Sequence, residues 1–247
     1  MSLPPDFAET GLLIRPGARP PARFQVIGER SSGTNYVKRL LGRNTPLEPT
    51  ELLGWKHGGF QAMAVPRDLV VILSVRNARD WARSMFAKPW HTGTALQSLP
   101  FHAFLRAPWE TVIDHPKYFA NAGPAMLGQP LQQDRDPVTG RPYPNLFALR
   151  SGKLRTHLSL LGRDCAFVLC RHEELIANPQ AFLAQFRAGL GLPVSEAPLR
   201  PVVKRLGSRF NPAVERPAPP RDWAETDLAF MRAALDMGLE SQLGYRY

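Results

Sequence analysis

Two glycines separated by four residues bracket a segment whose residue types could bind phosphate. Gly28 and Gly33 stand between an apolar run at 23–27 and a stretch at 36–41 that has the 3–4 apolar spacing of an amphipathic helix closed by Gly42. A loop that runs from a strand into a helix offers backbone N–H groups and the positive end of the helix dipole to an anion. The spacing therefore predicts a phosphate-binding type of loop, with an ordinary tight turn as the alternative.

The residues after Gly33 indicate which classes of phosphate-binding protein the loop fits. A nucleoside triphosphatase carries Lys and then Ser or Thr at this point, to neutralise the terminal phosphates and hold magnesium. This chain carries Thr34 and Asn35 instead, which disfavours triphosphate hydrolysis. A P-loop nucleotide or small-molecule kinase remains one alternative function, and a catalytically inactive nucleotide-binding module remains another.

A second group of polar residues follows a β-branched run at 68–75. Arg76 comes directly after that run, and Ser84 lies eight residues later in a segment that Asn77 or Asp80 can cap as a helix. Arg is the side chain that binds phosphate or sulfate bidentately. The alternative for Arg76 is an ion pair with Asp80 at the start of the helix.

Lys56 and His57 are the best candidates for proton transfer. A neutral His near pH 7 can accept the proton of a hydroxyl, and a neighbouring Lys can stabilise negative charge as it develops. The alternative is that the pair ends a strand as solvated polar groups. Four other histidines lack the spacing of metal ligands and are assigned no role. They are His91, His102, His115 and His157.

The acidic pairs of the chain favour structural roles. Glu173 and Glu174 begin a helix, where carboxylates are stabilised without any catalytic task. Asp134 and Asp136 are expected to form an Asx turn ahead of Pro137 rather than a cation site. No metal site is predicted.

Taken in chain order, these motifs resemble those of the PAPS-dependent sulfotransferases. The phosphate loop of that family reads like 32–35 (SGTN), and its second nucleotide signature has the spacing of Arg76 and Ser84. The strand-to-helix segment of the family looks like 171–183, and its usual ending looks like 244–245. The resemblance covers most of the chain.

The resemblance implies a P-loop-type α/β fold and transfer of a sulfuryl group from PAPS to an acceptor hydroxyl, with no metal. PAPS carries a 5′-phosphosulfate and a 3′-phosphate, so two anion sites are expected. The resemblance places the 5′-phosphosulfate on the loop, where the candidate ligands are Arg30, Ser31, Ser32, Gly33, Thr34 and Asn35. It assigns the 3′-phosphate to Arg76, Ser84 and, as a weaker contributor, Arg205, and the catalytic roles to His57 and Lys56.

The chain departs from the family pattern in two places. Many members carry a catalytic Lys or Arg two residues before the loop glycine, where this chain has Ser31, and Arg30 stands one position earlier. Either the loop is reshaped or Lys56 takes over that charge. The C-terminal nucleotide segment of the family is matched only in part, by residues 204–207.

Strands and helices alternate along the chain, which predicts a single α/β domain over 1–247 with a mostly parallel sheet flanked by helices. Residues 1–22 are expected to be an irregular lead-in, and the irregular stretch 87–145 is expected to be an insertion that binds the acceptor. The other predicted segments are a strand at 165–170, helices at 146–161 and 180–190, a proline-rich loop at 193–220, and a final helix capped by Asp222 and ending near Leu239.

The acceptor is expected to be a small molecule or a glycan. Aromatic side chains of the insertion could stack on sugar rings, which favours a carbohydrate or glycolipid acceptor, or could simply pack the insertion. These residues are Trp90, Trp109, Tyr118 and Tyr143.

Composition excludes some partners. The 247 residues carry 31 Lys and Arg against 21 Asp and Glu, but this charge is spread along the chain without interleaved aromatics, so nucleic acid is not an expected partner. The chain shows neither a secretory leader nor an apolar stretch of about 20 residues that could span a membrane. A cytoplasmic protein without integral membrane association is therefore expected. Cys165 and Cys170 are expected to be core thiols on opposite faces of a strand.

Overall fold

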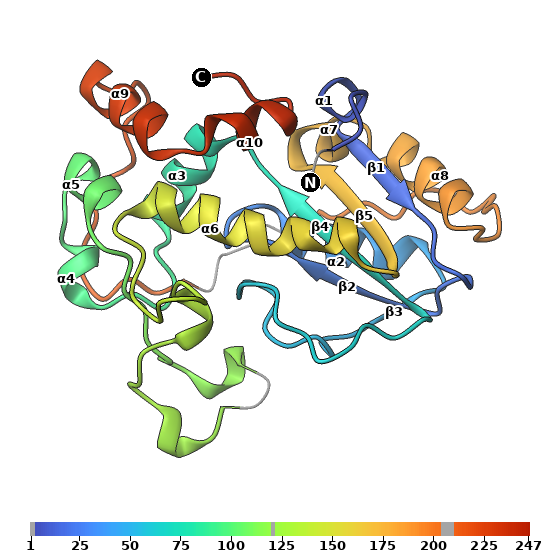
Figure 1. The fold of residues 1–247 in the computed structure, drawn as a ribbon, viewed down its shortest axis with the longest axis horizontal. Coiled ribbons are helices and arrows are strands. Elements are labelled where there is room, and N and C mark those ends of the chain that lie inside the picture. Colours follow the sequence, from blue (N-terminus) through green and yellow to red (C-terminus); the bar gives the residue numbers. More distant parts are fainter. Residues whose placement is uncertain (1–2, 120–121, 204–209) are drawn as a thin grey trace.

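The computed structural model describes residues 3–119, 122–203 and 210–247 (Figure 1). The strands are β1 (Leu12–Arg15), β2 (Arg23–Ile27), β3 (Glu48–Pro49), β4 (Leu69–Val75) and β5 (Ala166–Arg171). The α-helices are α1 (Phe7–Thr10), α2 (Thr34–Asn44), α3 (Ala78–Ala87), α4 (Thr94–Gln97), α5 (Phe101–Arg106), α6 (Leu146–Leu158), α7 (His172–Ala177), α8 (Pro179–Gly189), α9 (Glu225–Ala234) and α10 (Met237–Gln242). Short 3₁₀ turns are η1 (Pro116–Tyr118), η2 (Pro124–Met126), η3 (Gln132–Asp134) and η4 (Ser159–Gly162).

The described strands form one sheet in the order β1-β5-β4-β2-β3. Strands β5, β4, β2 and β3 run parallel, and β1 pairs with β5 in the antiparallel direction. Strand β4 is buried over its whole length, because a central parallel strand is covered on both faces. The predicted mostly parallel sheet flanked by helices is confirmed.

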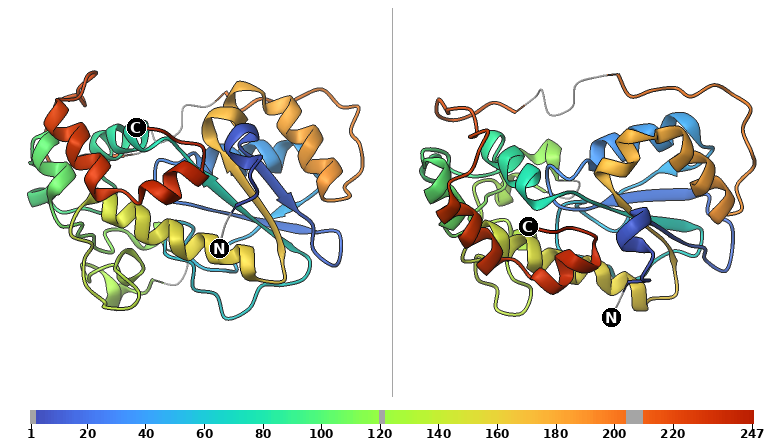
Figure 2. Two further views of the ribbon diagram at one scale, coloured as in Figure 1. Left: turned by 45° about the horizontal axis from the view of Figure 1, so that its top comes forward. Right: turned by 90° about the horizontal axis from the view of Figure 1, so that it is seen from above.

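Helices cover both faces of the sheet (Figure 2). On one face α2 and α8 pack against alternate strand residues such as Val26 and Ile72. On the other face α6 and the segment after α10 pack against the intervening residues, such as Ile27 and Leu73. Because alternate side chains of a strand point to opposite faces, each continuous apolar run in the sequence contributes to two separate cores.

Three parallel strands end at the same edge of the sheet, and the residues that follow them are suited to a site. Strand β2 leads into Gly28, β4 into Arg76 and β5 into His172. Strand β2 pairs with β3 on one side and with β4 on the other, so the direction of winding reverses between β2 and β4. In open α/β sheets, ligands bind outside the carboxyl ends of the strands at such a reversal.

The stretch 87–145 is largely irregular, as predicted, and lies beside α3 and α6 (Figure 1). Within it, Phe104 and Trp109 are fully buried in a third hydrophobic cluster together with Trp81 of α3 and Phe147 of α6. Aromatic burial of this size anchors the stretch firmly to the two helices.

The predicted irregular lead-in over 1–22 is wrong in part, because α1 and β1 lie within it. Strand β1 has only four residues, all half-buried, at the edge of the sheet. It is formed by antiparallel pairing with β5, for example between Leu12 and Cys170. Because the partner strand lies more than 150 residues away, the four residues of β1 carry no local sequence pattern that predicts a strand.

Three predicted helix boundaries also differ. The helix predicted at 146–161 ends at Leu158 and is followed by the 3₁₀ turn η4. Helix α2 continues through Gly42 to Asn44, where the Asn44 side chain donates to the Leu40 carbonyl oxygen at 2.7 Å and the Thr45 N–H donates to the Leu41 carbonyl oxygen at 2.9 Å. Asp222 caps no helix: α9 begins three residues later, at Glu225. A separate helix, α10, follows instead, capped by Asp236.

Other local predictions are confirmed. Asn77 caps α3 by accepting a hydrogen bond from the Arg79 N–H at 3.0 Å. Cys165 and Cys170 are buried free thiols. Among the helices of the described residues, none combines the length and the apolar character needed to span a membrane.

Candidate functional site

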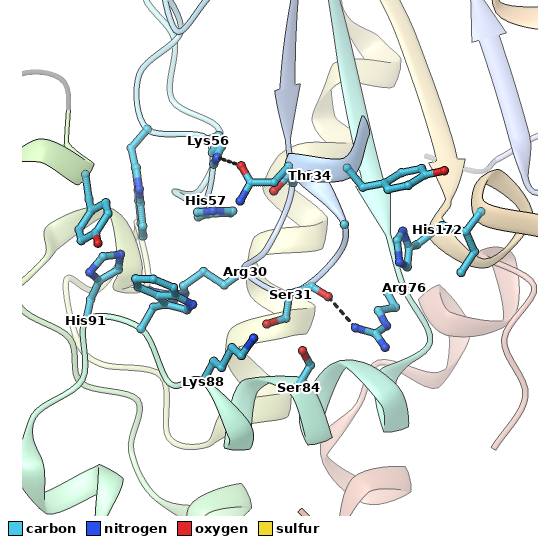
Figure 3. A pocket seen from close by; sticks show the side chains of 17 residues that line it. Arg30, Ser31, Thr34, Lys56, His57, Arg76, Ser84, Lys88, His91 and His172 are labelled. Atoms are coloured by element: carbon cyan, nitrogen blue, oxygen red, sulfur yellow. Dashed lines mark hydrogen bonds between the residues drawn. The ribbon is translucent and has the colours of Figure 1, made fainter. Parts of the chain in front are cut away.

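A cavity of about 480 Å³ opens at the carboxyl edge of the sheet (Figure 3). Its walls come from the loop after β2, the start of α2, the turn at 55–57, helix α3, the start of α7 and the stretch 87–145. The predicted site residues that line it are Arg30, Ser31, Gly33, Thr34, Asn35, Lys56, His57, Arg76 and Ser84. Ser32 is not among the lining residues, and Arg205 lies outside the described residues.

The loop after β2 requires glycine at both positions that the motif names. Gly28 has a φ of +142° and Gly33 a φ of +91°, which residues with a Cβ rarely adopt. A Cβ at Gly28 would lie 2.6 Å from the Ser74 carbonyl oxygen, and one at Gly33 would overlap the His172 ring. Ser31 has a φ of +64°, so a strained residue faces the cavity. The loop therefore passes tightly over the ends of β4 and β5.

Ser32 holds the loop in place from below. Its Oγ donates to the Glu29 carbonyl oxygen at 2.7 Å, and its own carbonyl accepts from Ser74 Oγ at 2.6 Å. The Gly28 N–H donates to the Lys56 carbonyl oxygen at 2.9 Å. The Ser32 side chain is therefore used within the loop, which corrects its predicted role as a ligand.

The start of α2 faces the cavity with free N–H groups. The helix has no side-chain cap at Gly33 and no acidic residue in its first turn. Within the described part of the chain, the N–H groups of Gly33, Thr34 and Asn35 donate to no backbone carbonyl. Unpaired N–H groups and the helix dipole together favour an anion at this point.

Cationic side chains surround this helix start. Lys56 Nζ donates to Asn35 Oδ1 at 2.6 Å, and Arg76 Nη1 donates to the Ser31 carbonyl oxygen at 3.2 Å. Lys88, from the end of α3, points into the same space (Figure 3). None of the described residues that line the cavity is Asp or Glu. The cavity is therefore suited to a ligand that carries several negative charges.

The charge of Lys56 is sensitive to pH near neutrality. Burial, supported by the positive charge of Lys38 and opposed by Glu51, lowers the pKa of Lys56 to about 8. The ammonium group is therefore present at pH 7 and is lost as the pH rises through about 8.

His57 stands beside the loop as a neutral imidazole. Its Nδ1–H donates to the Gly28 carbonyl oxygen at 2.7 Å, which leaves the lone pair on Nε2. Burial, together with the charge of Lys56, lowers the pKa of His57 well below its ordinary value. The ring packs edge to face against Trp55, with 5.5 Å between centroids. His57 thus carries an oriented, unprotonated ring nitrogen at neutral pH, and its role as a proton acceptor stays a prediction.

Carboxylates engage much of the Arg30 guanidinium, while its Nη1 has no hydrogen-bond partner among the described residues. Its guanidinium is 2% exposed, lies 2.6 Å from Asp134 Oδ2 and 3.2 Å from Glu29 Oε1, and stacks 5.3 Å from the ring centres of Trp55 and Trp109. The same two carboxylates also pair with Lys153, so two negative charges face two positive ones. The ion pairs give Arg30 a structural role, and its predicted role as a cofactor ligand stays a prediction for a residue that forms part of the cavity wall.

Asp134 is the centre of a buried ion cluster behind the loop. It pairs with Arg30 and Lys153 and accepts a hydrogen bond from Thr111 Oγ1 at 2.7 Å. Lys153 also donates to the His57 carbonyl oxygen at 2.8 Å. The cluster thereby joins the loop, the His57 turn, the stretch 87–145 and α6.

The predictions for the acidic pairs are confirmed for some residues and wrong for one. The Asx turn is confirmed for Asp136, whose Oδ1 accepts from the N–H groups of Val138 and Thr139. It is wrong for Asp134, which the ion cluster uses. Glu173 is structural, as predicted: its carboxylate accepts from the Asn77 N–H at 2.8 Å.

The stretch 87–145 contributes an aromatic wall. Trp90, His91 and Tyr118 line the cavity, whereas Trp109 and Tyr143 are buried in the third hydrophobic cluster. His91 is 6% exposed, bonds Asp114 Oδ1 through Nδ1 at 2.8 Å and has a φ of +69°. Of the four aromatic candidates, Trp90 and Tyr118 therefore line the cavity, as a binding role for this stretch would need. Trp109 and Tyr143 pack the interior of the insertion instead.

The structure adds residues that the motifs did not name. Lys88 directly follows α3, and its N–H donates to the Ser84 carbonyl oxygen, so its position four residues after Ser84 could have indicated it. His172 directly follows β5, as Arg76 follows β4, so its position at a strand end could have indicated it as well. The alternative ion pair of Arg76 with Asp80 does not form among the described residues.

No protein-family model matches this chain, and no curated protein matches its sequence.

Proposed function

We propose that this protein is a sulfotransferase that moves the sulfuryl group of PAPS to a hydroxyl of an acceptor. The observation that carries the proposal is one cavity in which an uncapped helix start, Lys56, Arg76 and Lys88 surround the space beside a neutral His57. PAPS is a ligand with separate charged groups at its 5′ and 3′ positions. The strand, tight loop and helix over 23–44 support a P-loop-type fold for the domain.

Two sides of the cavity fit the two anionic ends of PAPS. The N–H groups of 33–35 and the Lys56 ammonium suit the 5′-phosphosulfate. Arg76, Ser84 and Lys88 suit the 3′-phosphate, because guanidinium, hydroxyl and ammonium groups all donate to phosphate oxygens. Lys88 replaces Arg30 and Ser32 in the proposed set of ligands.

The proposed reaction needs one proton acceptor and stabilisation of one leaving group. The acceptor oxygen forms a bond to sulfur while the bond between sulfur and the phosphate oxygen of the product PAP breaks. His57 Nε2 takes the hydroxyl proton. The electron pair stays on the phosphate oxygen of PAP, where Lys56 and the loop N–H groups stabilise the negative charge.

The kinase alternative finds less support in the cavity. Transfer of phosphate from magnesium-bound ATP uses carboxylate and other oxygen ligands that hold the metal next to the phosphates. Among the described residues that line the cavity there is no carboxylate. A module that binds the nucleotide without turnover is separated from an enzyme by variants of His57.

The acceptor is proposed to reach His57 along the aromatic wall. The faces of Trp90 and Tyr118 can stack on a sugar ring, and the neighbouring His91 can hydrogen-bond a hydroxyl through the ring nitrogen that Asp114 does not use. A carbohydrate or glycolipid acceptor therefore fits best.

Transfer of label tests the proposed function. The protein is incubated with PAPS labelled in its sulfuryl group and with panels of glycans, glycolipids, phenols and sterols. We expect label to move to at least one hydroxyl acceptor. Transfer from γ-labelled ATP with magnesium, and none from PAPS, would show that the protein is a kinase.

Arg76→Ala is expected to remove the preference for a 3′-phosphate. Loss of charge-assisted hydrogen bonds, each worth about 1.5–3 kcal/mol, predicts that PAP binds about 10–100-fold more weakly. ADP, which lacks the 3′-phosphate, should bind the variant as it binds the wild type. Calorimetric titration of both nucleotides measures the difference. An equal loss of affinity for PAP and ADP would show that Arg76 does not recognise the 3′-phosphate.

The affinity for PAP is expected to fall as the pH rises through about 8, since only protonated Lys56 attracts the anion. The proton equilibrium predicts binding about tenfold weaker at pH 9 than at pH 7. Lys56→Arg should bind PAP with the same affinity at both pH values, because Arg stays charged. Lys56→Met should also show no change with pH, but its affinity should equal the weaker one that the wild type has at pH 9. Titrations at both pH values measure the effect, and a wild-type profile without a slope would remove Lys56 from the site.

A further inference from the structure

A second cavity, of about 390 Å³, lies on another side of α3. It is bounded by α3, by residues 221–223, by α9 and by the C-terminal residues 246–247, which lie near one another in Figure 1. Among the described residues that line it are five arginines: Arg79, Arg83, Arg221, Arg232 and Arg246. It shares no lining residue with the first cavity.

Most of this positive charge has no carboxylate partner. Of the five arginines, Arg232 alone forms an ion pair within the described residues, with Glu225. Asp80 also lines the cavity but is in no ion pair there. Residues 1–2, 120–121 and 204–209 contain no Asp or Glu, so they cannot supply the missing carboxylates. Elsewhere on the protein, Arg23, Arg106 and Arg155 each have a carboxylate partner.

Two buried donors of the same cavity also lack a partner. Trp223 is 8% exposed, and neither its Nε1 nor Arg83 Nε has a hydrogen-bond partner among the described residues. Arg79 lies over the Trp223 ring, 6.0 Å from its centroid. Clustered guanidinium groups repel one another, and an unpaired buried donor costs free energy. An anion with several oxygens would relieve both costs.

We propose that this cavity binds a small ligand that carries at least two phosphate or sulfate groups. Guanidinium groups bind such groups bidentately, and arginines from α3, α9 and the C-terminal residues can reach more than one of them at once. The volume suits a small molecule held in a concave site. This inference does not depend on the proposed sulfotransferase activity.

Calorimetric titration with inorganic tripolyphosphate tests the proposal, with a disulfated disaccharide as a second arm that separates a phosphate ligand from a sulfate ligand. The double variant Arg83→Gln/Arg246→Gln is expected to bind the preferred probe at least tenfold more weakly than the wild type. The matched control is Arg19→Gln/Arg67→Gln, which removes the same charge from exposed sites outside the cavity. It should bind within about twofold of the wild type.

Arg76→Ala places the probe in one cavity or the other. A probe in the second cavity keeps its affinity in this variant, because Arg76 lines only the first. Thermal unfolding of each variant shows that it is folded. The proposal is overturned if neither probe binds, if both double variants lose affinity equally, or if Arg76→Ala abolishes binding. None of these results would contradict the binding of PAP in the first cavity.

Discussion

His57→Asn is expected to lower kcat for sulfuryl transfer by about 10²–10⁴-fold, the usual contribution of a general base. The Asn amide can still donate to the Gly28 carbonyl oxygen, but it offers no nitrogen that accepts a proton. The affinity for PAP should therefore change little. Single-turnover transfer to an identified acceptor and calorimetric titration of PAP measure the two quantities.

His157→Asn is the matched control for this prediction. His157 is also buried, and its Nε2 bonds the Gly58 carbonyl oxygen at 2.9 Å, but it does not line the cavity. Its substitution should change kcat by no more than a few-fold. A His57→Asn protein that keeps nearly the wild-type kcat would show that another group takes the proton.

Asp134→Asn is expected to lower the free energy of unfolding by about 3–5 kcal/mol, as when one partner of a buried ion pair is removed. Asp134 is 1% exposed, and its loss would leave Arg30 and Lys153 with Glu29 as their remaining carboxylate. For a chain of this length, the midpoint of thermal unfolding should fall by about 6–20 °C. Differential scanning calorimetry measures both quantities.

Asp136→Asn controls for the same chemical change two residues away. Asp136 forms a turn with Val138 and Thr139 at the surface, and Asn can accept the same hydrogen bonds. We expect its free energy of unfolding to stay within about 0.5 kcal/mol of the wild type. A similar small loss in Asp134→Asn would mean that the ion cluster contributes little to stability.

The sequence was sufficient to predict the central strands β2, β4 and β5 and most of the residues that line the cavity at their carboxyl ends. Each central strand is a continuous apolar run, and the residues after it, such as Gly28 and Arg76, fall at one edge because the strands are parallel. The tight loop was predictable as well, since only glycine tolerates the backbone at Gly28 and Gly33. These features follow from the local pattern of apolar residues and glycines and from the parallel direction of the strands.

The roles within the site were less predictable, because they depend on contacts between distant residues. Arg30 looked like an anion ligand, but Asp134, 104 residues away, forms a buried ion pair with it that the local sequence does not indicate. Ser32 looked like an anion ligand as well, yet Ser74 of β4 donates to its carbonyl oxygen and its side chain does not line the cavity. No spacing in the sequence shows which charged groups meet in the folded chain.

Thermal unfolding with PAP, PAPS, ADP and magnesium-bound ATP in parallel is the most direct test of the central claim, because it needs no acceptor. A ligand at 100 times its dissociation constant adds about 2.7 kcal/mol to the free energy of unfolding, which for this length raises the midpoint by about 5–11 °C. We expect PAP and PAPS to give this shift and ADP to give little. A shift with magnesium-bound ATP alone, or no shift with any nucleotide, would contradict the assignment of the cavity to PAPS.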